Sequence, residues 1–408
     1  MSKYRRELGT EVYCTLMHKN VPVMDFLMYQ ENGEIIKATD ILEYSHLPLG
    51  ILKGGVVDKA EFNSWWRNRQ IPINRDGLAT KLERLGVSIP ALVQKSMGLS
   101  LSDQYWVKPK GVDIDWGNIN FFENDWEEDL GWYLLGCETS KPLDEISFMT
   151  PDPATNGCLP KGWHIVHGER CLFKTSERVG LRQQSFNEVV AHKLMERLGV
   201  DHAPYSIEMV EGIPMCITPD IINKDTELIP MVDIIKLQKH RNSVSAHQQV
   251  VACSKQLGCD DIETKLSQMI VVDYLLHNTD RHLNNFGLIR DANTLETIGF
   301  APIFDSGTSL WYDFGNETFE ALKGTECKPF RSKFDKQLEL ATDLSWFKPE
   351  ALEGFGDEIR KIFSSCGDMA ISPEQTERVV RGFEANLRKV VNYAHTLDSF
   401  NPDTPGLN

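Results

Sequence analysis

A block of polar residues between two apolar segments holds the side chains best suited to chemistry. The run from His277 to Asn285 follows an apolar stretch and precedes a strand-like one. Asp280 lies five residues before Asn285, and Asp305 follows the next strand-like segment. In phosphoryl transfer one carboxylate orients the attacking hydroxyl, and hard oxygen ligands hold Mg²⁺ against the nucleotide phosphates. The spacing therefore favours Asp280 as a catalytic base, with Asn285 and Asp305 as metal ligands.

A lysine and a glutamate upstream would complete such a site. The stretch from Glu169 to Lys174 reads as a strand, and Ser185-Phe-Asn-Glu188 reads as the beginning of a helix. In the catalytic interpretation Glu188 holds Lys174, so that the ammonium group contacts the α- and β-phosphates of the nucleotide. The same residues also fit a capping box, with Ser185 as N-cap and Glu188 as its partner. Both interpretations of Glu188 stay open at this point.

A polar loop ahead of Lys174 is a candidate for contacts with nucleotide phosphates. It runs over residues 154–162 between predicted strands and contains Thr155, Gly157 and Lys161. A glycine-containing loop of this kind can cover phosphates, but it matches neither Gly-x-Gly-x-x-Gly nor a Walker loop. An ordinary β-turn explains the loop equally well when it is taken alone.

A predicted hairpin leads from this region to a hinge. Its strands cover residues 205–210 and 213–218, separated by a Glu-Gly turn. In the order of elements expected here, the backbone from Thr218 to Ile221 contacts the adenine of the nucleotide.

The elements that position these residues form a strand-rich part followed by a helical part, which predicts an α+β fold with two lobes. We expect an N-terminal accessory α+β module at 1–105, a strand-rich lobe at 106–220 and a helical lobe at 221–408. Within the first module, residues 11–17 and 21–29 read as paired strands. Apolar residues at three- and four-residue spacing predict helices over 245–257, 260–277, 332–344, 349–365 and 373–397.

Composition restricts the class of protein. The chain has 408 residues, 41% of them hydrophobic, and a net charge of −16, which argues against coating nucleic acid or an anionic membrane. Its nine cysteines include no Cys-x-x-Cys pair, so reduced thiols are expected rather than a zinc ribbon. No apolar run reaches the length of a membrane span, and no apolar segment follows the basic residues near the start. A cytoplasmic location is therefore predicted.

The motifs taken in order resemble the HipA-like serine/threonine kinases of bacteria over residues 145–395. The block Asp280-Arg281-His282 is also similar to the catalytic loop of phosphatidylinositol-kinase-like enzymes, which share the fold. The resemblance implies a two-lobed protein-kinase-like fold, ATP and Mg²⁺ as cofactors, and a protein hydroxyl as substrate. It assigns Asp280 as base with His282 beside it, Lys174 as the ATP lysine, and Asn285 with Asp305 as Mg²⁺ ligands. The motifs that carry it are Thr155-x-Gly157-x-x-Pro160-Lys161, Phe173-Lys174, Asn187-Glu188, His277-Asn-Thr-Asp280-Arg-His-Leu-Asn-Asn285 and Pro302-Ile-Phe-Asp305.

Regulation in that family suggests an antitoxin partner and autophosphorylation, but the sequence departs from the family at the modified position. Some members are growth-arresting toxins restrained by a small DNA-binding antitoxin, and some are silenced by autophosphorylation in the glycine-containing loop. The residue where the best-known members carry the modified serine is Ala154 here, with Thr155 beside it as a possible substitute. The first hundred residues also differ from the toxin's amino-terminal module, so an antitoxin-like partner is an open expectation. Residues 305–332 occupy the place of an activation segment.

Two other classes of function remain as alternatives. A lipid or small-molecule kinase fits the Asp-Arg-His block, although the chain shows no basic amphipathic helix for a membrane surface. A DNA-associated regulator with a degenerate kinase fold would need a recognition helix. The stretch from Gly98 to Trp106 faintly suggests one but contains no Lys or Arg, so direct nucleic-acid binding is not expected.

Overall fold

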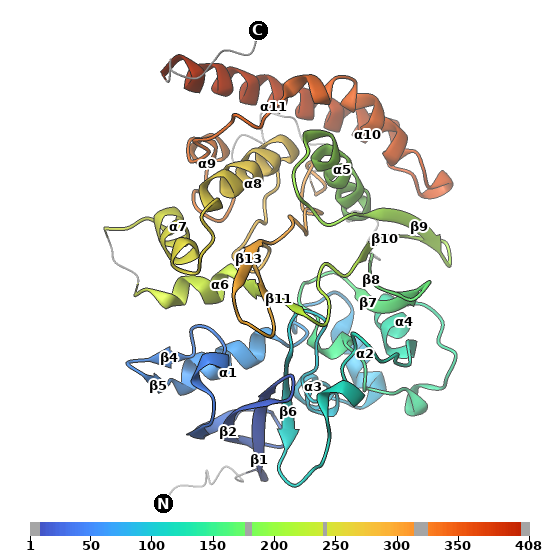
Figure 1. Cartoon of the computed structure of the whole chain (residues 1–408). Helices are drawn as coiled ribbons and strands as arrows, with labels where there is room; N and C mark the ends of the chain where they lie inside the picture. The colour runs from blue at the N-terminus through green and yellow to red at the C-terminus, as the bar shows by residue number, and fades with distance from the viewer. Residues whose placement is uncertain (1–8, 176–181, 240–242, 314–324, 401–408) are drawn as a thin grey trace, which may run out of the picture. The chain divides into compact units, whose positions relative to one another are not determined.

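The computed structural model describes residues 9–175, 182–239, 243–313 and 325–400 (Figure 1). The chain divides into two compact units. The first contains residues 1–174 together with two later segments, 222–229 and 290–296. The second contains residues 175–221, 230–289 and 297–408. Each unit is described separately below, and the three-part division expected from the sequence stays a prediction.

The first unit contains a four-stranded antiparallel sheet in the order β3-β2-β1-β6. The predicted hairpin of 11–17 and 21–29 is confirmed as its central pair. Phe26 from this sheet packs edge-on against Phe62 of the neighbouring helix α1, and both rings are fully buried. The strands are β1 (Glu11–His18), β2 (Val21–Tyr29), β3 (Ile35–Ile41) and β6 (Tyr105–Pro109), with a short pair β4 (Leu52–Lys53) and β5 (Val56–Val57).

Short helices surround this sheet, and their caps explain where they begin. The Asp58 side chain accepts from the Glu61 N–H at 3.0 Å, and Ser88 caps the third helix in the same way. Trp65 and Trp66 are buried in the core. Residues 98–106 form no helix, so the recognition helix considered from the sequence is not present there. The helices are α1 (Lys59–Asn68), α2 (Leu78–Leu85), α3 (Ile89–Lys95) and α4 (Asp129–Leu135), with 3-10 turns η1 (Tyr44–His46), η2 (Trp116–Asn118), η3 (Leu143–Glu145) and η4 (Asp152–Ala154).

The first unit also contains the hairpin that carries the predicted ATP lysine. Strand β7 (Lys161–Val166) pairs antiparallel with β8 (Glu169–Lys174), which confirms the strand expected for the second segment. The polar loop ahead of Lys161 follows the 3-10 turn η4 and not a strand, because two prolines at 151 and 153 interrupt the chain there.

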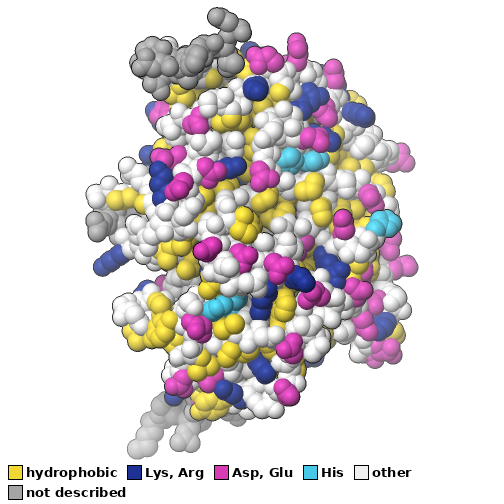
Figure 2. Space-filling model, in the orientation of Figure 1, with side chains coloured by type: hydrophobic (Ala, Val, Ile, Leu, Met, Phe, Trp, Pro, Cys, Tyr) yellow, Lys and Arg dark blue, Asp and Glu magenta, His cyan; other side chains and the backbone are white. Residues whose placement is uncertain are grey.

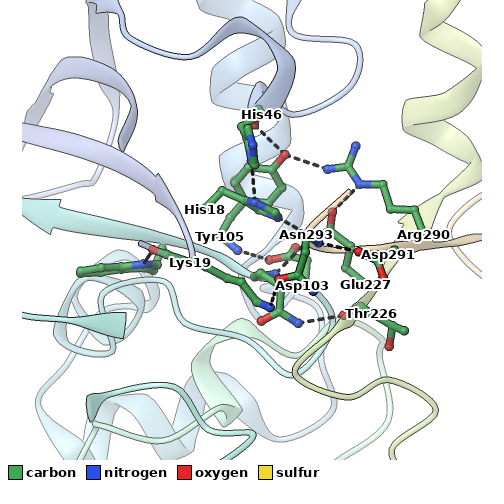
Figure 3. A network of polar contacts seen from close by, with 12 residues as sticks. His18, Lys19, His46, Asp103, Tyr105, Thr226, Glu227, Arg290, Asp291 and Asn293 are labelled. Atoms are coloured by element: carbon green, nitrogen blue, oxygen red, sulfur yellow. Dashed lines mark hydrogen bonds and ion pairs between the residues drawn. The ribbon is translucent and has the colours of Figure 1, made fainter. Parts of the chain in front are cut away.

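A buried polar network joins the N-terminal sheet to the two later segments of the first unit (Figure 3). His18 Nε2 lies 3.0 Å from Glu227 Oε2, and its other ring nitrogen lies 2.9 Å from His46. Arg290 pairs with Glu227 and donates to the Tyr105 hydroxyl at 3.0 Å. Burial alone would raise the pKa of Glu227, but His18 and Arg290 outweigh it and lower this pKa to about 2. Buried charges of this kind are stable only when paired, so the later segments are integral to the first unit.

The second unit begins with helix α5, continues with a strand hairpin and is mainly helical after it. The hairpin β9 (Ser206–Val210) and β10 (Ile213–Pro219) is antiparallel, as predicted. Three short strands lie at the positions in the sequence where the chain leaves one unit and enters the other. They are β11 (Thr226–Pro230), β12 (Gly287–Asp291) and β13 (Thr297–Phe300). The helices are α5 (Gln183–Leu198), α6 (Met231–Ile234), α7 (Ala246–Gln256), α8 (Ile262–Leu276), α9 (Phe334–Leu338), α10 (Phe355–Phe363) and α11 (Pro373–Phe400), with η6 (Ile235–Leu237), η8 (Pro349–Leu352) and η9 (Gly367–Met369).

Two of the predicted helices are shorter than expected. The helix predicted over 349–365 is divided because Gly354 adopts φ +70°, a left-handed conformation that ends the first turn. The helix predicted over 332–344 covers only α9, and beyond it the Tyr393 hydroxyl donates to the Ala341 carbonyl at 3.1 Å. Helix α11 packs on α8 and α10, and α5 packs on α8 and α10 (Figure 1). Helix α8 ends at the polar block that begins with His277.

Charged side chains of both signs share the surface. On the face drawn in Figure 2, Lys and Arg side chains are interspersed with Asp and Glu side chains. Within the part of the chain that the structure describes, no helix is long and apolar enough to cross a bilayer.

Candidate active site

The polar block after α8 forms a tight loop with defined backbone bonds. His277 ends the helix with φ +53°, and its ring stacks between Trp311 and Phe334. Burial lowers the pKa of His277 to about 4. Beyond it, the Asn278 side chain accepts from the Asp280 N–H at 3.1 Å. The loop is therefore a rigid structure on the end of a buried helix, as a positioning role requires.

Arg281 is the hub of this loop. Its side chain is fully buried and makes a two-pronged ion pair with Asp273 of α8, with bonds of 2.9 and 3.0 Å. The same guanidinium donates to the carbonyl of Asn285 at 3.1 Å and to the Ser306 hydroxyl at 2.9 Å. It also donates to the carbonyl of Phe304. One buried cation thus connects the loop of Asp280 with the turn of Asp305.

Asp280 lies at the half-exposed edge of the loop. Its carboxylate accepts from Lys328 at 2.6 Å, while His282 Nε2 lies at 4.0 Å. The Asn285 side-chain amide donates to the Asp280 carbonyl at 3.3 Å. That bond uses the nitrogen of Asn285 and leaves its side-chain oxygen as the atom suited to a cation. The structure therefore brings Asp280, His282 and Asn285 together, as the sequence predicts.

The turn that carries Asp305 is held by helix α5. Asp305 has φ +58°, a conformation uncommon outside glycine and frequently associated with functional positions. The next residue, Ser306, donates its N–H to Glu188 Oε2 at 2.8 Å. Asn187 donates to the carbonyls of Gly307 and Ser309 at 2.9 and 2.7 Å. The adjacent pair on α5 therefore fixes the turn of the predicted metal ligand.

The capping-box interpretation of Glu188 is wrong. Helix α5 begins at Gln183, so Ser185 lies inside the helix and is not its N-cap. The Ser-x-x-Glu pattern places the N-cap at Ser185, but the helix has Arg182 as its N-cap and so starts three residues earlier. Glu188 is buried and directed to the Asp305 turn. Its predicted pairing with Lys174 stays a prediction, since Lys174 belongs to the first unit.

The predicted phosphate loop lies in the first unit with Lys174. Thr155 is buried, and its hydroxyl donates to the Asp152 carbonyl. Gly157 adopts φ +100°, and a Cβ atom there would lie 2.2 Å from Lys161 Nζ. The positive φ favours glycine at this position, and a side chain there would also displace the Lys161 ammonium group. The structure thus brings Thr155, Gly157 and Lys161 into one loop.

The predicted adenine hinge lies in the second unit. The Thr218 hydroxyl donates to the Pro219 carbonyl at 3.3 Å, and Ile221 packs against a small apolar cluster that includes Tyr205. Contact of this backbone with adenine stays a prediction.

The donor set fits Mg²⁺ held mainly by phosphate and water. Asp305 offers a carboxylate and Asn285 a carboxamide oxygen, both hard ligands. Within the described ranges, no group of three or more His, Cys, Asp or Glu side chains is placed to hold a metal ion. A site of one or two protein oxygens agrees with the way Mg²⁺ binds alongside nucleotide phosphates.

Two residues of this region were not assigned roles from the sequence. Arg281 was noted only within a motif, although Asp273 was a usable signal, since an acid inside an apolar helix needs a buried partner. Lys328 gave no signal, because its position depends on tertiary contacts. The buried Gln337 of α9 accepts from the N–H groups of Phe330 and Arg331 at 3.1 and 3.2 Å and so fixes the segment that carries Lys328.

A protein-family model matches the part of the chain that contains this site. The family model described as the HipA-like C-terminal domain matches residues 154–370, more than half of the chain. That range includes every site residue predicted from the sequence. No curated protein matches the chain significantly in sequence.

Two solved structures are similar in fold. The Shewanella oneidensis MR-1 HipA, in a complex with HipB and operator DNA, has a TM-score of 0.54 and 12% identity, covering 96% of this chain and 100% of that one. The Helicobacter pylori proinflammatory kinase CtkA has a TM-score of 0.47 and 16% identity, covering 62% and 95%. The similarity to HipA confirms the predicted α+β, kinase-like fold. The HipA complex contains operator DNA, so the expectation that nucleic acid is not bound directly finds no support in this comparison.

Proposed function

The chain belongs to the HipA-like kinase family, and from this premise we propose that it is an ATP- and Mg²⁺-dependent serine/threonine protein kinase. The single observation that carries the proposal is the Arg281 hub, which holds the loop of Asp280 and the turn of Asp305 in one rigid frame. Phosphoryl transfer depends mainly on positioning and electrostatics, and a frame of this kind supplies both.

Each predicted residue has a defined task in this proposal. Asp280 orients the substrate hydroxyl and accepts its proton as the γ-phosphate is transferred. Asn285 and Asp305 hold Mg²⁺, which when bound neutralises charge on the phosphates. Lys174 contacts the α- and β-phosphates. Glu188 positions the Asp305 turn through the Ser306 N–H.

The remaining predicted residues act around this centre. Thr155, Gly157 and Lys161 cover the phosphates, and the backbone from Thr218 to Ile221 contacts adenine. His282 stands beside the base. The conformation of Thr155 argues against it as an acceptor of autophosphorylation, because its hydroxyl is buried and already donates to a carbonyl.

The experiment is intact-mass measurement after incubation of the purified chain with Mg-ATP and a generic serine/threonine substrate protein. We expect phosphate transfer by the wild type and none by Asp280→Asn or Asp305→Ala. Asp260→Asn is the matched control, since it removes an exposed carboxylate outside the site. Transfer by the Asp280 variant at the wild-type rate would refute the proposal. Transfer to a lipid or small molecule only would favour the alternative kinase class.

An antitoxin-like partner and a cytoplasmic location are further parts of the proposal. The support for the partner is the HipA structure, which contains HipB and operator DNA. Co-purification of this chain with a small DNA-binding protein encoded beside it is the test. Elution of the two proteins as separate species at micromolar concentration would refute the partner.

A further inference from the structure

A segment of the N-terminal module runs beside the predicted phosphate loop. Residues 71–76 make a series of contacts with residues 153–158, all within the first unit. The Arg75 side chain donates to the carbonyl of Thr155 at 2.6 Å and to that of Gly157 at 3.0 Å. The series also includes Ile71 N–H to the Pro153 carbonyl at 3.3 Å, Asp76 N–H to the Cys158 carbonyl at 2.9 Å, and Asn74 Nδ2 to Cys158 Sγ at 3.5 Å.

These contacts occupy the carbonyl side of the loop. A phosphate-binding loop presents backbone N–H groups to the anion, so its carbonyls must point elsewhere and find donors there. Arg75 and Asp76 supply such donors to three carbonyls of residues 155–158. Without them the carbonyls would either be left unsatisfied or turn towards the nucleotide, where they would repel the phosphates.

Arg75 is built into this position and keeps its charge there. Its side chain is 3% exposed, and among the described residues no carboxylate is hydrogen-bonded to it, although the charge of Asp152 favours its cationic form. Burial lowers the pKa of Arg75 to about 10, so it is still a cation at neutral pH. In the described part of the chain, Nη1 of Arg75 is buried without a hydrogen-bond partner. A cation left under-satisfied beside a predicted phosphate loop is an unusual cost for a purely structural residue.

We propose that Arg75 is a positioning residue for nucleotide binding: it holds the loop of residues 154–161 by its carbonyls and so lets the N-terminal module set the affinity of the loop for ATP phosphates. This rests on the proposed kinase function. It gives the N-terminal module a direct role in the chemistry of the site, which the sequence alone did not suggest.

The first test measures the loop itself and needs no nucleotide. Hydrogen exchange of peptides covering 71–77 and 153–160 is compared between wild type, Arg75→Gln and Arg75→Lys. Both variants should exchange at least about tenfold faster in these peptides, because lysine keeps the charge but cannot span two carbonyls. Arg69→Gln is the matched control, since Arg69 is a buried arginine of the same module that donates to the carbonyls of Gly98 and Tyr105. It should leave the loop peptides unchanged.

The second test measures the binding of Mg-ATP by titration calorimetry on the same variants. The dissociation constant should rise about tenfold or more in both Arg75 variants, as expected for lost hydrogen bonds from a charged donor. Arg69→Gln should bind as the wild type does. Arg75→Lys keeps the test valid if Arg75→Gln fails to fold.

Three results would overturn the proposal. They are unchanged exchange of the loop in both Arg75 variants, wild-type affinity of Arg75→Lys for Mg-ATP, and an equal loss of affinity in Arg69→Gln. If the wild type binds no Mg-ATP, both the proposed kinase function and the role of Arg75 in nucleotide binding are refuted. The hydrogen-exchange measurement still decides whether Arg75 holds the loop.

Discussion

Replacement of Arg281 by methionine is the most demanding test of the catalytic frame. Arg281 is fully buried and pairs with Asp273, which is also buried. Burial alone would lower the pKa of Arg281, but the adjacent Asp273 raises it above its usual value, so Arg281 stays a cation. Methionine fills much of the volume but leaves the Asp273 carboxylate inside the protein with the Asn278 amide as its remaining described side-chain donor.

The cost follows from the structure. Removing one partner of a buried ion pair typically costs about 3–5 kcal/mol, because the other charge stays buried and uncompensated. The carbonyls of Asn285 and Phe304 also lose their donor. Since whole domains are stable by only about 5–15 kcal/mol, we expect a large fall in the free energy of unfolding.

The assay is urea denaturation followed by circular dichroism, with Asp273→Asn and the double variant completing a cycle. The two single changes should be strongly non-additive, with a coupling of at least about 1.5 kcal/mol, because the double variant buries no unpaired charge. Arg360→Met is the control, because Arg360 forms exposed ion pairs with Glu377 and Asp357. This change should lower the free energy of unfolding much less than Arg281→Met does. Two results would refute the structural role of Arg281: additive changes in the free energy of unfolding, or a destabilisation by Arg281→Met no greater than that by the control.

Two further predictions concern charged contacts at other places. Lys328→Met removes the cation that lies 2.6 Å from the Asp280 carboxylate and should lower kcat for protein phosphorylation about tenfold or more at saturating ATP. Lys333→Met, a change at an exposed lysine of the same segment, should leave kcat unchanged. Equal rates for wild type and Lys328→Met would contradict a role of Lys328 in positioning Asp280. Because the folded-state pKa of Glu227 is about 2, below its ordinary 4.5, the stability it contributes is complete above pH 4.5 and is lost as the pH falls towards 2. Thermal unfolding of the wild type should therefore show a fall across that window that Glu227→Gln lacks, and parallel pH profiles would argue against the network.

Local patterns predicted several elements of the fold and the loop of the predicted catalytic residues. The hairpin at β1 and β2 follows from two short strand-like runs around a turn, and α8 follows from an apolar run that ends abruptly in polar residues. Asp280, His282 and Asn285 come together because they belong to one short loop, so their spacing in the sequence already determines their proximity. Local physics decides all of these, and a single sequence contains that information.

Contacts between distant segments were not predictable in the same way. Arg75 contacts residues 80 and 82 positions away, and Lys328 contacts a residue 48 positions away. Neither residue has a distinctive neighbourhood in the sequence, and only the fold decides which carbonyl or carboxylate it meets. The capping box predicted at Ser185 is wrong for a related reason. The local pattern is valid, but helix α5 begins before it.

The N-terminal module shares buried polar contacts with the later segments of the first unit and so is not an appended domain. Glu227 follows the predicted adenine hinge, and Arg290 follows the catalytic loop, yet both charges are buried against His18 and Tyr105 of the first sheet. Removal of residues 1–105 would expose this ion pair and take Arg75 from the phosphate loop. If the proposed kinase function holds, we expect a chain without residues 1–105 to transfer no phosphate from Mg-ATP, because its charges are unpaired and its loop is released although every predicted catalytic residue is present; intact-mass measurement checks this.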